Sequence, residues 1–588
     1  MEARLRWMLA FVYLVLGLYG LRLVQLQVIE HKRYVTKSQG NYLKTESIPA
    51  PRGRILDRNG VVLADNRLAY DLVYRGGSVR FLDRMLDLLG LEALPEVKEP
   101  TVVYPNLPPD LVPTLEELTA GQENLKIRVR VERTYPNPIA GPVIGYVQGP
   151  SKADLKEGYE PGDLVGKAGL EAALEERLRG QRGLKLVERD VRGHVVREVI
   201  LRPPVPGEDV RLTLDYELQV AAEKALKEAV ADVNRGRKKL GLPPIKRARG
   251  AAVAIDLQGG VLAMATAPAF DPNLFVRLPV DKKAVLAVIR DSDKPLLNRA
   301  VQAYPPGSTF KPISASALLE SGLIPPGRVY RCLPYIVYGG QRRHNWSARD
   351  MGPMTVEEAL AFSCNTWFYQ AVIDAGPLKA LKAIHDRARL LGLGEPTGLE
   401  LAEKAGLVPS AAWKRRVYGE PWYPGETLSV AIGQGPILAT PAQLARVYAT
   451  LFSGLRPRLH FVLGEGTRTP VPGRYWSYIR RGLRKTVTEG TARFGFKDFP
   501  VPTAGKTGTA ETPGKRAGFE HAWYAGFGPY PGGKKPPIVV VAFVEEGGEG
   551  SRAALPVVKK VMAAFWGIKG ADADQGHEER PRRPAGRR

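Results

Sequence analysis

The chain has 588 residues, a length typical of two or three domains rather than one. Its 85 lysines and arginines against 61 aspartates and glutamates give a formal net charge of +24, which favours a polyanionic partner such as nucleic acid, anionic lipid or an acidic wall polymer. No zinc-finger, RNA-recognition or basic-zipper pattern occurs, so we expect no nucleic-acid partner. The two cysteines are too few for a disulfide framework.

An apolar segment near the N-terminus has the length of a membrane-spanning helix. Trp7 to Leu21 carry no charge, and after Arg22 the apolar stretch continues to Ile29. About 20 mainly apolar residues cross a bilayer, and the span from Leu5 to Leu26 reaches that length if Arg22 extends toward the interface. No small-residue cleavage site follows, so we predict an uncleaved anchor rather than a signal peptide.

The region that follows the anchor is rich in charges, proline and glycine and contains short strand-like runs. Arg54–Asn66 has Asn59-Gly60 between two apolar runs, which predicts a β-hairpin. Lys167–Gly180 has apolar residues at helical spacing and ends in glycine, which predicts one helix. These patterns predict a separate α+β domain that ends near residue 206.

A larger domain is predicted from residue 207 to 568. Leu214–Val233 has the pattern of a long amphipathic helix, and Ala251–Thr266 predicts a hairpin that turns at Gly259-Gly260. Three more strand-like runs come late in the chain, at residues 502–511, 521–530 and 536–546. Strands at both ends of a domain, with helical patterns between them, predict one antiparallel sheet packed by helices. Residues 569–588 have the composition of a disordered basic tail.

The single S-x-x-K motif of the chain joins Ser308 to Lys311. A Pro-Pro-Gly sequence precedes it and a helical pattern follows as far as Gly322, so we predict that Ser308 lies at a helix N-terminus. A spacing of three puts both side chains on one helix face, where a desolvated lysine can take the proton of the serine hydroxyl. Taken alone, such a motif more often marks a capping serine followed by a surface lysine.

Two further motifs follow in the chain. Thr355–Glu358 has the pattern of a capping box that opens a helix, and this helix runs into Ser363-Cys364-Asn365, where a second helix is predicted. Much later, Lys506-Thr507-Gly508-Thr509 lies in a strand-like run. A strand with a glycine lets a peptide pair alongside, and Lys506 supplies positive charge for a carboxylate. The three motifs in this order are far more specific than any one of them.

This set of motifs resembles that of the penicillin-binding proteins and serine β-lactamases. The resemblance extends along nearly the whole chain and is to the class B penicillin-binding proteins. It is carried outside the motifs by residues 52–64, 133–149, 167–180, 212–219, 433–445 and 521–529. No counterpart of a glycosyltransferase domain is found. The chain most resembles the elongation-type members, the group of penicillin-binding protein 2, and the division-type members are the alternative.

The resemblance implies a multidomain fold. Its parts are a cytoplasmic stub and transmembrane anchor (1–29), an elongated non-catalytic α+β pedestal domain of the dimerisation type (30–206), an α+β transpeptidase domain of the penicillin-binding protein/serine β-lactamase type with an antiparallel sheet and helices (207–568), and the tail (569–588). The implied activity is that of a serine D-Ala–D-Ala transpeptidase which cross-links peptidoglycan in cell elongation and shape. A β-lactam-hydrolysing enzyme, a β-lactam sensor and a non-catalytic scaffold of the wall-synthesis complex are the other readings of the same motifs.

The resemblance also implies residue roles. Ser308 attacks the D-Ala–D-Ala carbonyl, and Lys311 is the general base for that attack. Ser363 passes a proton to the leaving D-Ala, while Asn365 orients the acyl-enzyme and the base. The terminal carboxylate is held at the third motif (Lys506, Thr507, Gly508 and Thr509). The backbone N–H groups of Ser308 and Thr509 form the oxyanion hole.

The two cysteines lie between and within the first two motifs, in a segment that also contains His344 and Asp350. Cysteine and histidine residues this close together in sequence are compatible with a zinc site. The resemblance implies a metal near this loop, but this chain matches the residue pattern for it only in part. The spacing is not that of a structural zinc site. Cys332 and Cys364 are therefore predicted to be free buried thiols, with a disulfide and a metal site as the alternatives, and we expect no metal and no cofactor.

A transpeptidase that lacks a polymerase needs nascent glycan from elsewhere. The resemblance implies an elongation-type SEDS-family glycosyltransferase in the membrane, peptidoglycan stem peptides as substrates, and β-lactams as inhibitors. Gly17 and Gly20 of the anchor and the Arg54–Asn66 hairpin, which chain length puts near the membrane, are the candidate contacts. Basic residues flank the anchor on both sides, so the charges do not indicate its orientation. The chemistry indicates a single-pass inner-membrane protein with a cytoplasmic N-terminus and a periplasmic catalytic domain.

Overall fold

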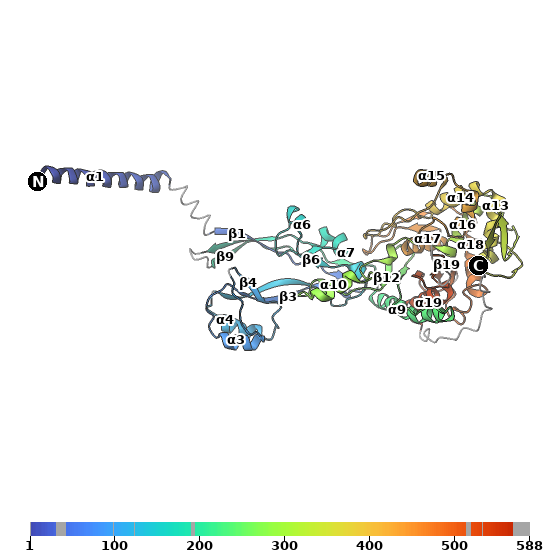
Figure 1. The fold of residues 1–588 in the computed structure, drawn as a ribbon, viewed down its shortest axis with the longest axis horizontal. Helices are drawn as coiled ribbons and strands as arrows, with labels where there is room; N and C mark the ends of the chain where they lie inside the picture. Colours follow the sequence, from blue (N-terminus) through green and yellow to red (C-terminus); the bar gives the residue numbers. More distant parts are fainter. Residues whose placement is uncertain are drawn as a thin grey trace.

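The computed structural model describes residues 2–30, 43–97, 99–122, 124–189, 195–512, 519–531 and 533–568. These residues form an elongated molecule in which helix α1 (Glu2–Val24) projects at one end, a slender region of strands follows, and a larger domain lies at the other end (Figure 1). The predicted tail at 569–588 is outside the described residues, as are residues 31–42.

Helix α1 continues into a short π-helix, η1 (Gln25–Ile29), and makes no contact with the body of the molecule that buries its apolar side chains. Trp7 and Leu21 are 77% and 70% exposed. The stretch from Trp7 to Ile29 is long and apolar enough to cross a membrane. So much exposed apolar surface is unfavourable in water and matches the surroundings of lipid tails, as the sequence predicted.

The described residues of the pedestal form two larger sheets and a short two-stranded sheet in which β6 pairs with β7. The first has the order β1-β8-β9 and lies on the side of the anchor (Figure 1), and the second has the order β10-β2-β3-β4, with β5 also paired to β3. The strands are β1 (Leu43–Ile48), β2 (Ile55–Leu56), β3 (Val62–Tyr74), β4 (Thr101–Tyr104), β5 (Leu125–Thr134), β6 (Val147–Gln148), β7 (Val165–Gly166), β8 (Gly183–Arg189), β9 (Val195–Arg202) and β10 (Val210–Arg211). The helices are α3 (Leu82–Leu89), α4 (Val112–Thr119), α5 (Gly141–Ile144), α6 (Lys152–Lys156), α7 (Gly169–Ala173) and α8 (Glu175–Leu178).

The predicted hairpin at Arg54–Asn66 is confirmed, because β2 and β3 pair antiparallel around Gly60, whose φ is +94°. Its predicted position near the membrane is wrong. The turn instead contacts the start of the larger domain: the Arg58 N–H donates to the Leu214 carbonyl at 2.7 Å, and Asn59 donates to Asp215 at 3.2 Å. Chain distance from the anchor did not reveal that this turn lies at the end of the pedestal that meets the larger domain.

The single helix predicted at Lys167–Gly180 is instead two short ones, α7 and α8, which meet at Leu174. Glu171 in α7 is fully buried and pairs with Arg52 at 3.0 Å and Arg133 at 2.7 Å. These ion pairs join the helix to strands that lie far from it in sequence. The local pattern predicted one continuous helix. The structure instead has a break at Leu174, close to the buried Glu171 carboxylate that is paired through tertiary contacts.

The larger domain is built on one five-stranded antiparallel sheet of order β12-β11-β21-β20-β19. Its strands come from both ends of the domain, as predicted: β11 (Gly250–Ile255), β12 (Val261–Ala267), β19 (Ala504–Ala510), β20 (His521–Gly528) and β21 (Ile538–Val544). Alternate residues of β11 belong to two different hydrophobic cores, since Val253 packs in one and Ala252 in the other. Both faces of the sheet are therefore covered.

One face is covered by α9 (Tyr216–Lys239) and α19 (Gly550–Trp566), which belong to the second of these cores. The long helix predicted from Leu214 is confirmed, and it extends past Val233 to Lys239. The remaining helices are α10 (Lys282–Arg290), α11 (Lys311–Glu320), α12 (Val356–Ala361), α13 (Asn365–Ala375), α14 (Pro377–Leu390), α15 (Ala411–Tyr418), α16 (Pro424–Ala431), α17 (Pro441–Ser453) and α18 (Trp476–Thr488), with the 3-10 turns η2 (Pro272–Phe275), η3 (Arg299–Val301) and η4 (Gly307–Phe310). Short strands complete the domain: β13 (Tyr330–Arg331), β14 (Tyr335–Tyr338), β15 (Gln341–His344), β16 (Pro353–Met354), β17 (Leu455–Pro457) and β18 (Arg468–Pro470).

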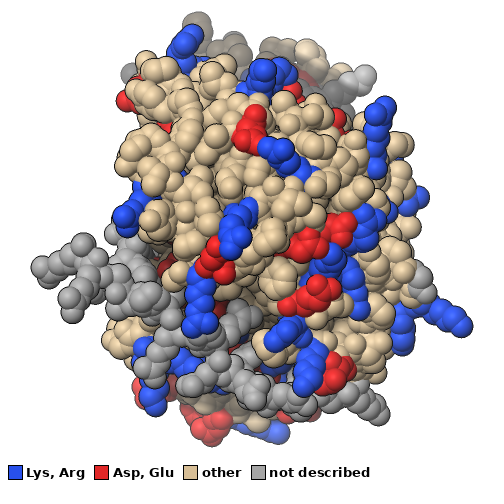
Figure 2. Space-filling model, turned by 90° about the vertical axis from the view of Figure 1, so that its right-hand side faces the viewer, with Lys and Arg blue, Asp and Glu red and all other residues tan. Residues whose placement is uncertain are grey.

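The end of the molecule opposite the anchor carries basic and acidic side chains interspersed among uncharged ones (Figure 2). The net charge of +24 is therefore not gathered into one continuous basic patch on this face. Nucleic-acid binding proteins carry such a patch as their electrostatic footprint, so this face does not resemble one.

Candidate active site

Ser308 lies in the 3-10 turn η4, directly before α11, with Pro312 in the first turn of that helix. The turn is held against β19. Gly307 has φ +53°, and a Cβ added there would come within 2.6 Å of the Thr509 carbonyl oxygen. Only glycine permits this approach, so the residue before Ser308 brings the first motif onto the strand that carries the third.

Lys311 is fully buried at the start of α11, and its Nζ points at the second motif. Nζ donates to the Ser363 carbonyl at 2.6 Å and to Asn365 Oδ1 at 2.6 Å, and it lies within hydrogen-bond distance of Ser363 Oγ at 3.2 Å. Burial lowers the pKa of Lys311 well below its usual value, and the nearby Lys506 lowers it further. A neutral amine with a free lone pair can accept a proton, which is what a general base requires.

The second motif occupies the junction between α12 and α13, as predicted. Thr355 and Glu358 form the expected capping box, α12 ends at Ala361, and α13 begins at Asn365. Ser363 in the junction has φ +56°, which is rare for a residue with a side chain and costs on the order of 1–3 kcal/mol. The turn directs its carbonyl and hydroxyl to Lys311.

The third motif lies in β19, at the edge of the sheet. A Cβ on Gly508 would come within 2.8 Å of Thr309 Cγ2 and 2.9 Å of Trp523 Cβ, so glycine is required where β19 meets η4. Lys506 is fully buried, and burial lowers its pKa to about 7. It is therefore charged only in part at neutral pH. A bound carboxylate would favour the charged form.

The structure thus brings the three motifs together from η4, the α12–α13 junction and β19. The close approach of Gly307 and Thr509 puts Ser308 and Thr509, the residues expected to supply the oxyanion-hole N–H groups, on adjacent backbone segments. Such preorganised donors stabilise charge that develops on a carbonyl oxygen during acyl transfer.

Four supporting residues were not assigned roles from the sequence. Thr491, after α18, shares a 2.6 Å hydrogen bond between its hydroxyl and that of Thr507. Gln434 Nε2 donates to the Thr509 carbonyl at 3.4 Å, Tyr448 to the Thr309 carbonyl at 3.0 Å, and Trp523 to the Pro305 carbonyl at 3.0 Å. Gln434 and Trp523 fall in segments that carried the family resemblance, whereas no local signal in the sequence marked Thr491.

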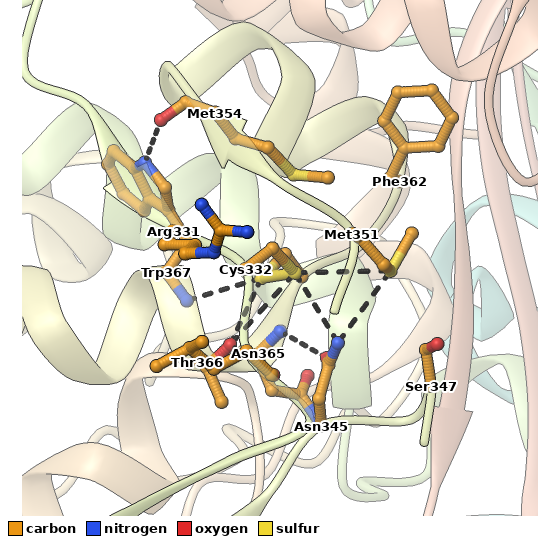
Figure 3. The surroundings of a disulfide bond; sticks show 12 residues. Arg331, Cys332, Asn345, Ser347, Met351, Met354, Phe362, Asn365, Thr366 and Trp367 are labelled. Carbon is orange, nitrogen blue, oxygen red and sulfur yellow. Dashed lines mark hydrogen bonds between the residues drawn. A yellow bond between two sulfur atoms is a disulfide. The ribbon is translucent and has the colours of Figure 1, made fainter. Parts of the chain in front are cut away.

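The prediction of free thiols is wrong: Cys332 and Cys364 form a disulfide (Figure 3). The two cysteines lie 32 residues apart in sequence, and packing of the 332–352 loop against α13 brings their Cα atoms to 6.1 Å. A disulfide leaves neither sulfur as a thiolate ligand for zinc. Asp350 pairs with Arg331 at 2.6 Å, and the described part of the chain contains no group of three or more metal-ligating side chains.

Comparison with known proteins agrees with this geometry. Residues 250–563 match the family described as the penicillin binding protein transpeptidase domain, and residues 47–212 match the penicillin-binding protein dimerisation domain. The peptidoglycan D,D-transpeptidase MrdA of Acinetobacter baumannii is 30% identical over 617 residues, which cover 96% of this chain and 87% of the relative.

Solved structures agree over most of the chain as well. A chain from the structure "Structural coordination of polymerization and crosslinking by a peptidoglycan synthase complex" is 61% identical, with a TM-score of 0.83 over 97% of this chain and 100% of that one. The penicillin-binding protein PBP2 of Helicobacter pylori, solved in complex with MreC, is 25% identical with a TM-score of 0.75, over 90% of this chain and 99% of that one.

Proposed function

The chain belongs to the penicillin-binding protein transpeptidases, as a peptidoglycan D,D-transpeptidase of the elongation type, and we propose that Ser308 is its acylated nucleophile. The observation that carries this proposal is the buried Lys311, which hydrogen-bonds to the second motif one helical turn after Ser308. A lysine whose pKa is lowered by burial is suited to take the serine proton.

In the proposed reaction, Ser308 Oγ attacks the carbonyl between the two terminal D-alanines while Lys311 accepts its proton. The N–H groups of Ser308 and Thr509 stabilise the oxyanion. Ser363 passes a proton from Lys311 to the departing amine, the C–N bond breaks, and D-alanine leaves. The amine of a second stem peptide then attacks the Ser308 ester and loses a proton to Lys311. The ester C–O bond breaks, Lys311 returns the proton to Ser308 Oγ, and the cross-link is formed.

The third motif binds the substrate's terminal carboxylate in this proposal. Lys506 supplies the charge, Thr507 and Thr509 supply hydroxyl groups, and Gly508 lets β19 lie against η4, the turn that carries Ser308. β-Lactams are bound at the same site and acylate Ser308. The alternatives of a hydrolase or a β-lactam sensor share the nucleophile and differ in what happens to the acyl-enzyme.

Mass spectrometry of the intact protein tests these roles. Incubation with a penicillin is expected to add one drug mass, and the adduct is expected to map to the peptide that contains Ser308. Ser308→Ala should remove the adduct and leave the circular dichroism spectrum and melting temperature unchanged. Removing a catalytic nucleophile costs on the order of 10⁶ in kcat, so retained labelling would exclude the assignment. Rapid loss of the adduct in water would favour a hydrolase.

A partner of the kind found in a peptidoglycan synthase complex is supported, because a chain 61% identical to this one was solved within such a complex. We propose that the partner is an elongation-type SEDS-family glycosyltransferase in the membrane. Two exposed surfaces suit such a contact. Among the described residues, no atom beyond the neighbouring turns of α1 lies within 4 Å of a Cβ added to Gly17 or Gly20. On the anchor side of the pedestal, Val196 and Ile200 of β9 are 65% and 64% exposed. The relative from Helicobacter pylori binds MreC, which makes an MreC-type protein a second candidate partner.

Within the described part of the chain, one helix is long and apolar enough to cross a membrane, which agrees with a single-pass protein of the inner membrane. We propose that its N-terminus is cytoplasmic and that residues 30–568 lie on the periplasmic face, because the substrate is outside the cell. The proposed boundaries are 29 for the anchor, 206 for the pedestal and 568 for the transpeptidase domain. Protease added to spheroplasts should remove residues 30–568 if this orientation is correct, and full protection would exclude it.

A further inference from the structure

The disulfide joins the second motif to a loop that precedes it in the chain. Cys364 is the middle residue of the motif, with Ser363 before it and Asn365 after it. It also caps helix α13, since its sulfur accepts the Trp367 N–H at 3.3 Å. Both half-cystines are completely buried. A shift of the disulfide therefore also shifts Ser363 and Asn365, the residues that contact Lys311.

The other half-cystine is anchored at the base of the loop. Cys332 follows β13, which pairs with β16. The Cys332 N–H donates to the Gly352 carbonyl at 2.8 Å, and the Met351 N–H donates to the Cys332 carbonyl at 2.9 Å. These bonds continue the β13–β16 ladder and close the loop that carries the β14–β15 hairpin. Cys332 is thus fixed by backbone pairing that does not involve the second motif.

Asn345 forms a second, parallel link between the loop and the motif (Figure 3). Its Nδ2 contacts Cys332 Sγ at 3.4 Å, and its Oδ1 accepts the Asn365 N–H at 2.9 Å. The Asn365 side chain in turn donates to the His344 carbonyl at 3.4 Å. The disulfide and Asn345 therefore hold Asn365 from two sides while its Oδ1 remains directed at Lys311.

The segment that these links hold is strained. Ser363 has a left-handed φ of +56°, a conformation that persists only where the surroundings determine it. The same turn presents the Ser363 carbonyl to Lys311 at 2.6 Å. A relaxed turn would move that carbonyl away, and an error of about 1 Å in the position of a catalytic group can cost on the order of 100-fold in rate.

We propose that the Cys332–Cys364 disulfide, together with Asn345, is a positioning element of the transpeptidase, which holds Ser363 and Asn365 in the conformation that orients Lys311. It does not touch substrate and acts through these residues. The inference rests on the proposed role of Ser308 and Lys311. It adds that the chemistry of this chain depends on an oxidised cysteine pair.

The test separates positioning from general stabilisation. Cys332→Ser breaks the bond and leaves the Cys364 thiol to cap α13. Acylation by a fluorescent penicillin is then measured well below the melting temperature, to give the rate constant at saturation and the half-saturating concentration. Because Lys506 and Thr507 are not linked to the disulfide, we expect the rate constant to fall on the order of tenfold to 100-fold with little change in the half-saturating concentration.

The matched control is Leu226→Ala. Leu226 is fully buried in α9, which packs on β12, the strand at the opposite edge of the sheet from β19. This variant should lower the melting temperature and leave acylation unchanged. If Cys332→Ser lowers only the melting temperature, or if both variants slow acylation equally, the disulfide is a stabilising crosslink and the inference is wrong.

A double-mutant cycle with Asn345→Ala tests whether the disulfide and Asn345 act on the same segment. If both links hold the same segment, the combined loss of acylation rate differs from the product of the single losses. A combined loss equal to that product would contradict a shared action on Asn365.

If Cys332→Ser does not fold, the folded wild type is treated with a phosphine, which is oxidised to its oxide with oxygen from water as the two sulfurs become thiols. Acylation should slow in step with thiol formation, and unchanged acylation of fully reduced, folded protein overturns the proposal.

Wild-type labelling at Ser308 is measured in the same series. Absence of a Ser308 adduct in the wild type would refute the proposed nucleophile. A normal wild-type adduct with unaffected Cys332→Ser kinetics would refute the positioning role alone.

Discussion

Lys311 Nζ donates a 2.6 Å hydrogen bond to Asn365 Oδ1, 54 residues further along the chain. This bond joins the first turn of α11 to the first residue of α13. It fixes the amine of the proposed base between two helix starts, and the Lys311 side chain is fully buried there. Burial then lowers the pKa of the amine, so the same packing that positions Lys311 also activates it.

The first prediction concerns the pH dependence of acylation. Lys506 must be charged to attract the substrate carboxylate, and burial lowers its pKa to about 7. As pH rises through that value the ammonium loses its proton, so the second-order acylation rate should fall on the alkaline side. Lys506→Arg keeps the charge at all these pH values and should move the alkaline limb upward, at some cost in rate because the geometry differs. A wild-type rate that is flat from pH 6 to 9 would contradict this role.

The acid side of the same profile reports on Lys311. Its pKa is lowered by burial and by Lys506, and it acts as a base only when neutral. As pH falls through the lowered pKa the amine is protonated and acylation should decline. Lys311→Met should abolish acylation at every pH while the variant stays folded, as judged by its melting curve. The two lysines are coupled, so the measured limbs belong to the pair.

The second prediction concerns Thr491. Its hydroxyl bonds to that of Thr507 at 2.6 Å, so Thr491→Val keeps the shape and removes the partner. Loss of one such bond costs about 1 kcal/mol, or about fivefold, and should appear as weaker penicillin binding with a smaller effect on the saturated rate. Thr488→Val at the exposed end of α18 is the control and should leave both constants unchanged. Equal constants for both variants would show that Thr491 does not support the third motif.

The third prediction concerns Gly307. Gly307→Ala adds a Cβ that would lie 2.6 Å from the Thr509 carbonyl, so η4 and β19 must separate. Separation would displace the oxyanion-hole N–H groups and lower acylation on the order of 100-fold. Gly322→Ala is the control, because it has a similar φ of +69° and open space around the added Cβ. It should cost about 1 kcal/mol of stability and leave acylation unchanged.

The fourth prediction concerns the anchor. If Gly17 and Gly20 contact a polytopic partner, Gly17→Leu/Gly20→Leu should weaken co-purification with the glycosyltransferase and lower polymerase activity in a reconstituted pair, while penicillin labelling persists. Val12→Leu/Val15→Leu adds volume to a helix face away from the glycines and should have no effect. If the glycine variant co-purifies and stimulates polymerisation normally, the anchor only tethers the enzyme.

The sequence by itself determined the elements whose signals are local. The S-x-x-K at a helix start, the capping box at Thr355, the turn at Gly259-Gly260 and the strands of the closing sheet all depend on residues within a few positions of one another. The order of the three motifs was enough to indicate the family and its acyl-transfer chemistry. Which residues perform each step remains a prediction that the proposed variants test.

Only the tertiary structure decided how these elements meet. The Cys332–Cys364 bond, the Thr491–Thr507 contact and the burial that lowers the pKa of Lys506 to about 7 arise from segments that approach after folding. The position of the Asn59 turn against Asp215, rather than near the membrane, is of the same kind. Burial and contact depend on the packing of residues that can be more than 100 positions apart in the chain. The local sequence pattern does not predict that packing.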